Sequence, residues 1–315
     1  MKRLTLRRPA LPAASPTRVA RVTPAAPSAP ATPVSDARYD AVAQASAAAV
    51  ITGYSTSFGW ACRLLGKPVR GHVRNIYALV RLADEIVDGP VSAHDPARGR
   101  ELLDELEHET AHAVAWGFST NLVVHAYAIT ARRFELRPEL MEAFFASMRM
   151  DLDTTTHTPQ SFADYVYGSA EVVGLACLQV FLGAAGRTDY DALAPGARSL
   201  GAAFQKINFL RDLAADRDVL GRAYFPGIDP AHLTTAQRDV LVADIRTDLT
   251  AAHAALIQLP ANSRTAVTAA HGLFAELTDR IAQTPTDQLL RSRVRVPGQT
   301  KARILAHALA TGGRS

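Results

Sequence analysis

Two aspartates, Asp212 and Asp216, are the residues of this sequence whose type and spacing first suggest chemistry. On a helix that turns about 100° per residue, they share a face with Gln205 and Asn208, within an arc of roughly 80°. Most of the positions between them are apolar, so we expect this helix to be largely buried. A buried carboxylate needs a cation beside it. A divalent ion such as Mg²⁺, which prefers oxygen ligands, would bridge two carboxylates one helical turn apart.

The same pattern occurs a second time, earlier in the chain. Asp84 and Asp88 have the same spacing, and on a helix they share a face with Tyr77 and Arg81. One such pattern alone is typical of a solvated helix face. Two copies predict two facing helices that line a cavity with acid on both walls, which only cations and a polyanionic ligand would make stable.

Charge and composition set the limits of the fold. The chain has 315 residues, of which 48% are hydrophobic and 20% charged, so it can bury a sizeable core. Residues 1–35 contain six Lys/Arg, no acid and seven of the 18 prolines, which predicts a disordered basic tail. An inert, solvated tail is favoured over one that touches anionic lipid. The remainder carries 28 Lys/Arg and 30 Asp/Glu, so the high pI does not indicate nucleic-acid binding.

Helical periodicity predominates from Asp36 onward, and no run of alternating β-branched residues interrupts it. We therefore predict a single all-helical domain over residues 36–315. The predicted helices span residues 38–52, 55–66, 69–88, 95–116, 120–135, 138–152, 160–184, 189–220, 234–257, 262–283 and 299–311. Cys62 and Cys177 lie in apolar runs and indicate core positions in a reducing, cytoplasmic protein. The sequence contains no stretch of 18 uninterrupted apolar residues, so we predict no membrane span.

The segment His108-Glu-Thr-Ala-His112 matches the HExxH pattern of zinc peptidases. The extended form of that pattern fails, because Ala115 and Phe118 stand where the glycine and the third histidine should be. Because the surrounding segment is strongly charged, we favour an exposed helix face over a zinc site.

Two further stretches leave alternatives open. The hydroxyls of Ser55 and Ser57 are suited to capping a helix, and the same helix N-terminus would suit a phosphate. Tyr165 and Tyr167 are equally consistent with core aromatics and with rings that stabilise a carbocation.

Taken together, these segments resemble the phytoene and squalene synthase family, the head-to-head prenyl synthases, over roughly residues 36–310. The matching blocks are YSTSF (54–58), IYALVRLADEIVD (76–88), MRMDLD (148–153), YVYGSAEVVG (165–174) and FQKINFLRDLAADRDVLGRAYFP (204–226). Five blocks in the family order make the resemblance specific.

The resemblance implies an all-α, isoprenoid-synthase-type helical bundle with a central cavity. It implies metal ligation by Asp84, Asp88, Asp212 and Asp216, and catalytic roles for Tyr77, Arg81, Tyr167 and Tyr224. It implies substrate binding by Ser55, Ser57, Phe58, Gln205, Asn208, Arg211 and Arg222. Two departures, Ala215 and Glu85, leave the number of metal ligands open.

The implied reaction is ionisation of a prenyl diphosphate with Mg²⁺, or Mn²⁺ as an alternative, followed by attack of the second substrate through a cyclopropylcarbinyl diphosphate. We expect phytoene synthesis from two geranylgeranyl diphosphates, without NADPH, in carotenoid biosynthesis. The alternative within the class is dehydrosqualene, squalene or presqualene diphosphate synthesis from farnesyl diphosphate. A zinc peptidase and a non-catalytic prenyl-lipid binder are the alternatives from other classes. We further expect a monomer or weak dimer without a nucleic-acid partner, cytoplasmic and in peripheral contact with membranes.

Overall fold

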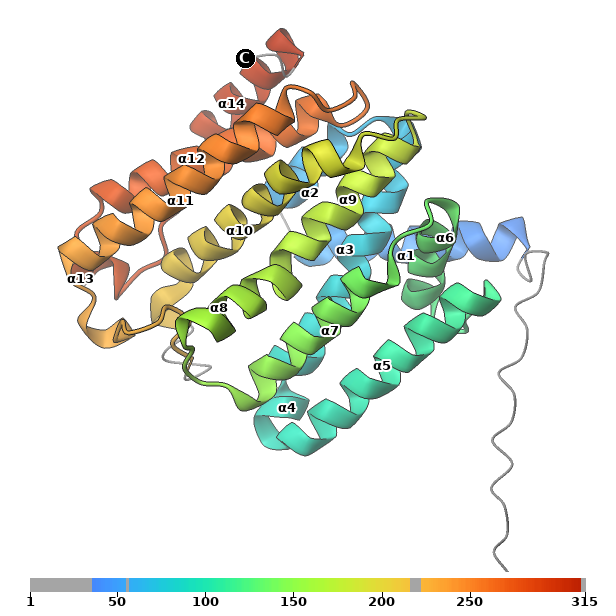
Figure 1. The fold of residues 1–315 in the computed structure, drawn as a ribbon, viewed down its shortest axis with the longest axis horizontal. Helices are drawn as coiled ribbons and strands as arrows, with labels where there is room; N and C mark the ends of the chain where they lie inside the picture. Colours follow the sequence, from blue (N-terminus) through green and yellow to red (C-terminus); the bar gives the residue numbers. More distant parts are fainter. Residues whose placement is uncertain (1–35, 55–56, 216–221, 313–315) are drawn as a thin grey trace, which may run out of the picture.

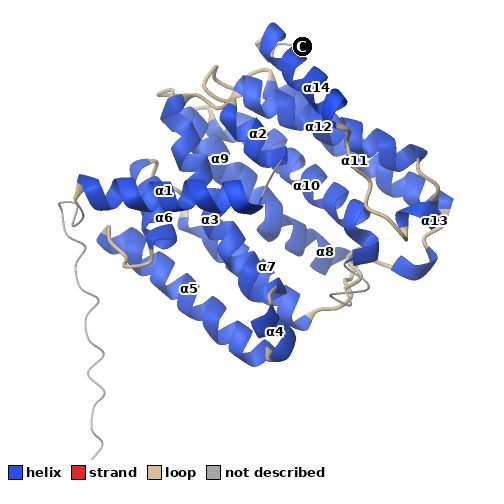
Figure 2. Cartoon of the chain, turned by 180° about the vertical axis from the view of Figure 1, so that it is seen from behind, coloured by secondary structure: helices blue, strands red, loops and turns tan. Residues whose placement is uncertain are grey.

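The computed structural model describes residues 36–54, 57–215 and 222–312, and these form helices joined by short loops (Figures 1 and 2). The described part contains no strand, and one isolated bridge pairs Thr156 with Ala223. The α-helices are α1 (Ala37–Tyr54), α2 (Ser57–Arg63), α3 (Lys67–Asp88), α4 (Pro90–His94), α5 (Pro96–Trp116), α6 (Leu122–Arg133), α7 (Pro138–Asp153), α8 (Pro159–Val166), α9 (Val172–Gly183), α10 (Tyr190–Ala215), α11 (Thr235–Leu256), α12 (Arg264–Gln283), α13 (Thr286–Leu289) and α14 (Gly298–Thr311). A π-helical turn, η1 (Tyr167–Glu171), joins α8 to α9, and a 3-10 turn, η3 (Pro230–His232), precedes α11.

Helix starts follow from side chains that satisfy the first free backbone amides. Asp95 accepts a hydrogen bond from the Arg98 amide at the start of α5, and Thr158 and Thr234 form capping boxes at α8 and α11. Proline in the first turn of α3, α5, α7 and α8 costs no hydrogen bond there. The predicted all-α architecture is therefore confirmed in the described part.

Two details differ from the predicted helices, and two predicted segments extend beyond the described residues. The short helices α4 and α13 were not predicted, because five or four residues carry too little periodicity to identify. The predicted helix 160–184 is divided by the π-helical turn. The predicted helix 189–220 is described to Ala215, and the predicted tail, residues 1–35, lies outside the described residues.

The helices pack as a bundle around two hydrophobic clusters. One cluster lies among α3, α5, α6, α7 and α9, and the other lies among α8, α10, α11, α12 and the loop residues 224–225. Helix α10 packs against α9, η1 and α11, so it lies at the centre of the bundle (Figure 1). Helices α3 and α10, which carry Asp84, Asp88 and Asp212, are thereby held in place by their neighbours.

Close contact with its neighbours fixes the π-helical turn. A side chain at Gly168 would collide with the Ser147 hydroxyl at 2.1 Å and the Ala143 carbonyl at 2.3 Å. The Ser147 hydroxyl donates a hydrogen bond of 3.1 Å to the carbonyl of Tyr165, one turn upstream. Such single π turns inside α-helices are frequent at functional sites.

The continuous helical stretch Pro159–Gly183 is long and apolar enough to cross a membrane by length and composition, and an 18-residue window within it has a mean hydropathy of 1.5. However, 56% of that window is buried inside the protein. Its apolar residues contact other helices and line an internal cavity, which accounts for its composition.

Candidate active site

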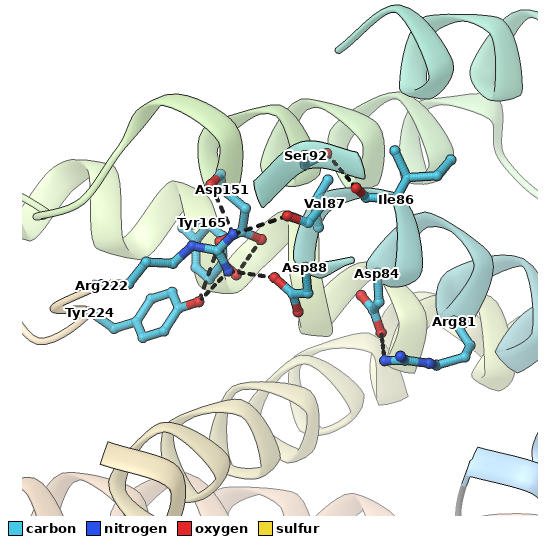
Figure 3. Close-up of polar contacts among 10 residues, drawn as sticks. All are labelled: Arg81, Asp84, Ile86, Val87, Asp88, Ser92, Asp151, Tyr165, Arg222 and Tyr224. Atoms are coloured by element: carbon cyan, nitrogen blue, oxygen red, sulfur yellow. Dashed lines mark hydrogen bonds and ion pairs between the residues drawn. The ribbon is translucent and has the colours of Figure 1, made fainter. Parts of the chain in front are cut away.

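The buried guanidinium of Arg222 is the hub of a polar cluster at the C-terminal end of α3 (Figure 3). Its Nη1 lies 2.6 Å from Oδ1 of Asp88 and donates to the hydroxyl of Tyr224 at 3.1 Å. Its Nη2 donates to the backbone carbonyls of Asp151, at 2.9 Å, and of Val87, at 3.4 Å. Burial lowers the pKa of Arg222, but Asp151, Tyr224 and Asp88 outweigh that effect and raise it above its ordinary value. Arg222 therefore stays a cation and ties the segment after α10 to the end of α3.

The Asp151 carboxylate lies on the other side of this guanidinium, at the end of α7. Only 5% of its side chain is exposed, and Tyr165 donates to its Oδ2 at 2.8 Å. Burial raises the pKa of Asp151 to about 7, although Arg222, 3.4 Å from its Oδ1, lowers it. Carboxylates with raised pKa values in a cluster of this kind mark candidate functional sites.

Asp84, one turn before Asp88, lies near this cluster with its own arginine. Nη1 of Arg81 is 3.8 Å from Asp84, and Nη2 of Arg81 pairs with Glu85. Burial, followed by the charge of Asp88, raises the pKa of Asp84 to about 7. Because 35% of the Asp84 side chain is still exposed, we place this carboxyl in a concave, solvent-accessible part of the site rather than in the core.

The second acidic pattern also faces arginines. Nε of Arg211 donates to Oδ1 of Asp212 at 3.0 Å. Arg293, from the segment between α13 and α14, approaches the same carboxylate with its Nε at 2.7 Å. Two cations around one carboxylate leave positive charge available for an anionic ligand.

The segment that follows α10 meets the first acidic pattern. Arg222, which follows α10, contacts Asp88 at the end of α3. Further from that end, Val80 of α3 and Gln205 of α10 line one internal cavity. Helices α3 and α10 thus both border the cavity, and the contact of Arg222 with Asp88 joins the segment after α10 to the end of α3.

The cavity has a volume of about 260 Å³ and an almost wholly apolar lining. Helices α2, α3, α9, α10, α11 and α12 and the turn η1 contribute to the lining. Its described polar side chains are Ser169 and Gln205, and the buried Ser169 hydroxyl has no hydrogen-bond partner. Both cysteines line this cavity, and burial raises the pKa of each thiol to about 12, so they behave as small apolar residues there. The space suits a hydrocarbon chain.

The donor set fits a hard divalent cation. The charges of Asp88, Asp151 and Glu85 all raise the pKa of Asp84, so an added cation would relieve their mutual repulsion. Among the described residues, no group of three or more His, Cys, Asp or Glu side chains could hold a metal by itself. Mg²⁺ is commonly held by one or two carboxylates together with phosphate oxygens and water, so this donor set suits a metal–diphosphate complex.

Several predicted site residues lie elsewhere or cannot be placed. Tyr167 lies apart from the cluster and packs on the hydrophobic core. The guanidinium of Arg198 lies 5.1 Å from the centroid of the Tyr167 ring. Tyr165, by contrast, contacts the acidic cluster through Asp151, and the catalytic role implied for Tyr167 stays a prediction. Tyr77 lies on α3, partly buried against the core, and Asn208 is half-buried on α10. Ser55 and Asp216 lie outside the described residues, as do the side chains of Ser57 and Phe58.

The HExxH segment is an exposed helix face, as favoured from the sequence. His108 and His112 are both exposed on α5, and His112 stacks on Trp116. The intervening Glu109 accepts a hydrogen bond from the Ser119 hydroxyl at 2.6 Å, which gives it a structural role.

A profile of squalene/phytoene synthase matches residues 51–300, which is most of the chain. The chain belongs to the squalene/phytoene synthase family. Maize phytoene synthase 3 is 28% identical over 274 residues, covering 81% of this chain and 62% of the maize protein. The 15-cis-phytoene synthase of a Paracoccus species is 29% identical over 184 residues, covering 56% of this chain and 58% of that protein. The 4,4'-diapophytoene synthase of Staphylococcus haemolyticus is 25% identical over 177 residues, covering 56% and 59%. The matched region thus spans about six-tenths of each relative.

Solved structures share the fold of this family member. A dehydrosqualene synthase in complex with ligand superposes with a TM-score of 0.72 at 20% identity, covering 87% of this chain and 97% of that one. The squalene synthase HpnC of Alicyclobacillus acidocaldarius superposes with a TM-score of 0.66 at 19% identity, covering 78% and 94%. The isoprenoid-synthase-type fold predicted from the resemblance is confirmed.

Two residues of the site, Asp151 and Arg293, were assigned no role from the sequence, and the role of Tyr165 was left open. Asp151 lies in the block MRMDLD, which indicated the family, but no second acid stands one helical turn away from it. Tyr165 was weighed together with Tyr167, and only the structure separates them. Arg293 lies in a run of alternating arginines, and no spacing rule connects it with Asp212, which is 81 positions away.

Proposed function

We propose that this protein is a Mg²⁺-dependent phytoene synthase that joins two geranylgeranyl diphosphates head to head in carotenoid biosynthesis. The observation that carries the proposal is the arrangement of one acidic, arginine-rich site beside an apolar cavity lined by α3 and α10. This pairing suits a ligand with a polyanionic head and a hydrocarbon tail. The names of several relatives, which include phytoene synthases, support the same assignment.

The proposed roles follow from charge and position. Asp84, Asp88, Asp212 and Asp216 would hold the metal, which when bound supplies neutralising charge for a departing diphosphate. Arg81, Arg211, Arg222 and Arg293 would add positive charge around that group and orient it. The apolar lining would exclude water from the allylic cation, which would otherwise be captured as an alcohol.

A farnesyl-dependent reaction is the second candidate. Relatives include a 4,4'-diapophytoene synthase and a presqualene diphosphate synthase, and the superposed structures include a dehydrosqualene synthase. Such an enzyme would share the acidic site and differ in the length of chain that its cavity accepts.

Purified protein should be incubated with Mg²⁺ and either geranylgeranyl or farnesyl diphosphate, with and without NADPH, and the extracted hydrocarbons identified by mass spectrometry. We expect phytoene from geranylgeranyl diphosphate, the same yield without NADPH, and none with EDTA. A C30 product made only from farnesyl diphosphate would select the second candidate. No product from either substrate, together with tight binding of both, would indicate a non-catalytic prenyl-lipid binder.

We also propose a cytoplasmic protein, monomeric or weakly dimeric, that contacts membranes peripherally. Both cysteines are free thiols, which suits a reducing compartment. The membrane contact is proposed because prenyl diphosphates with long chains, and still more their hydrocarbon products, partition into lipid.

A further inference from the structure

The C-terminal helix α14 lies on the outside of the bundle with few inward contacts (Figure 1). Ala308 is its one buried residue. Its neighbour is α12, to which it is held by a close approach of Ile304 to Gly272 and by a hydrogen bond from Nε of Arg264 to the Gly312 carbonyl at 3.2 Å. Helix α14 therefore presents most of its circumference to the surroundings.

The exposed side of α14 is apolar. In the first turn of α14, Gly298 and the exposed Gln299 fall within an arc of roughly 140° on the side away from Ala308, and beyond that turn five residues fall within it, all of them apolar. They are Ala302, Leu305, Ala306, Leu309 and Ala310, hereafter called the α14 outer face. Leu305 is half-buried and the other four are exposed, Leu309 by 58%. A 14-residue helix that turns its leucines outward needs a partner to cover them.

Positive charge surrounds this face. On the helix, Lys301 borders the arc on one side and Arg303 on the other. Between residues 288 and 312 there are five Lys/Arg and no Asp or Glu, and residues 249–275, which include most of α12, are also free of acid. An apolar helix face with basic borders is the pattern of helices that lie in the interface of anionic membranes.

The position of α14 relative to the cavity links this face to the proposed chemistry. Ala266, Val267 and Ala270 of α12 line the cavity, while Gly272 of the same helix contacts α14. Helix α12, about 10 Å in diameter, is thus the layer between the cavity and α14, and the α14 outer face lies on the far side of α14. A hydrocarbon product without its diphosphate has no affinity for water, so a lipid surface at this place would shorten its route out.

We propose that the α14 outer face docks this protein on an anionic lipid bilayer. This inference deepens the proposed function and rests on that function where the product is treated as a lipid. The charge and exposure of α14 do not depend on the proposed function. A second copy of the chain is the less suitable occupant, because three alanines and two leucines are far from the roughly 800 Å² per partner of a stable interface. Two copies would also bring like charges together.

The test is flotation of the full chain with vesicles of phosphatidylcholine alone or with 30 mol% phosphatidylglycerol. Leu305→Gln/Leu309→Gln removes the apolar contact without touching the cavity or the acidic site. Val240→Gln, at a 69% exposed position on α11, is the matched control. We expect the wild type to bind anionic vesicles at least tenfold better than neutral ones, with loss of that preference at high salt. The double variant should bind at least tenfold more weakly, and Val240→Gln should stay within twofold of the wild type.

Flotation of the double variant at the wild-type level would overturn the proposal and would instead assign any binding to another part, such as the basic N-terminal segment. A dimer that the double variant converts to a monomer, with unchanged flotation, would assign the face to a second copy and overturn it as well. Product formation in detergent, measured in parallel, separates this inference from the proposed function. The double variant should keep wild-type turnover in detergent. Absence of turnover in both proteins would count against the proposed function, whereas the flotation result would still test the docking of α14 on lipid.

Discussion

Replacement of Arg222 by methionine should destabilise the protein in a pH-dependent way. The variant loses a charge-assisted hydrogen bond to the buried Asp151 carbonyl, which contributes about 1.5–3 kcal/mol. It also leaves the Asp151 carboxylate without its cation. In the wild type the pKa of this carboxyl is about 7, raised by burial, and without Arg222 it rises further.

Protonation limits the second loss. At pH 8 the variant avoids an isolated buried charge by protonating Asp151. Because pH 8 lies about one unit above the wild-type pKa of this carboxyl, keeping it protonated there costs at most about 1.4 kcal/mol relative to the wild type. Below pH 7 the carboxyl is protonated in both proteins, so this part of the loss disappears. The expected destabilisation is therefore about 3–4 kcal/mol at pH 8 and about 1.5–3 kcal/mol at pH 6.

Urea unfolding at pH 6 and pH 8, followed by far-UV circular dichroism in EDTA, measures both values. Arg246→Met is the control, because Arg246 forms an exposed ion pair with Asp279 and its loss should cost no more than about 1 kcal/mol. Adding Asp151→Asn to the Arg222 variant should restore stability at pH 8, since the amide needs no cation. If Asp151→Asn destabilises the variant further at pH 8, or if the loss does not change with pH, the pairing described for Arg222 and Asp151 is wrong.

Four other outcomes are expected. Asp84→Asn should lower turnover at least 100-fold while leaving the circular dichroism spectrum unchanged; turnover within tenfold of the wild type would remove Asp84 from the active site. Ala270→Phe should fill part of the cavity and lower the rate with geranylgeranyl diphosphate at least tenfold relative to farnesyl diphosphate, whereas an unchanged ratio would show that the prenyl chain lies elsewhere. Burial lowers the pKa of His72 to about 4, so the protein should lose about 3 kcal/mol between pH 6.5 and pH 4 as this side chain is protonated on unfolding; His72→Gln should flatten that pH profile, and an equal slope in both proteins would assign the loss to other groups. His108→Ala should retain full activity, and elemental analysis should find no zinc in the wild type; zinc lost together with activity would favour the peptidase alternative.

Much of the fold could be predicted because its determinants are local. The periodicity of apolar residues and the capping residues Asp95, Thr158 and Thr234 act within a few positions of one another, and they locate the long helices. The short helices α4 and α13 depend on their neighbours, so the sequence pattern does not show them.

The acidic site was predictable only where its residues repeat on one helix. Asp84 and Asp88 are one turn apart, and so are Asp212 and Asp216, which makes each pair visible in the sequence. Asp151 is a single acid whose meaning comes from Arg222, 71 residues later, and no periodicity reports such a contact. The same holds for Arg293 and Asp212. The roles assigned to the individual site residues, and the need for Mg²⁺, stay predictions.

The extra residue in the π-helical turn η1 separates two parts of the stretch from α8 to α9 that face different surroundings. Upstream of it, Tyr165 is directed to the acidic cluster; downstream, Val173, Cys177 and Phe181 border the hydrocarbon space. Removing one residue from this turn would rotate one half against the other by about 100°, so Tyr165 and the cavity-lining residues of α9 would lose their present relative orientation. Under the proposed function, substitutions on α9 that change the cavity would leave the contact of Tyr165 with Asp151 in place, which gives engineers of chain length a segment to vary independently.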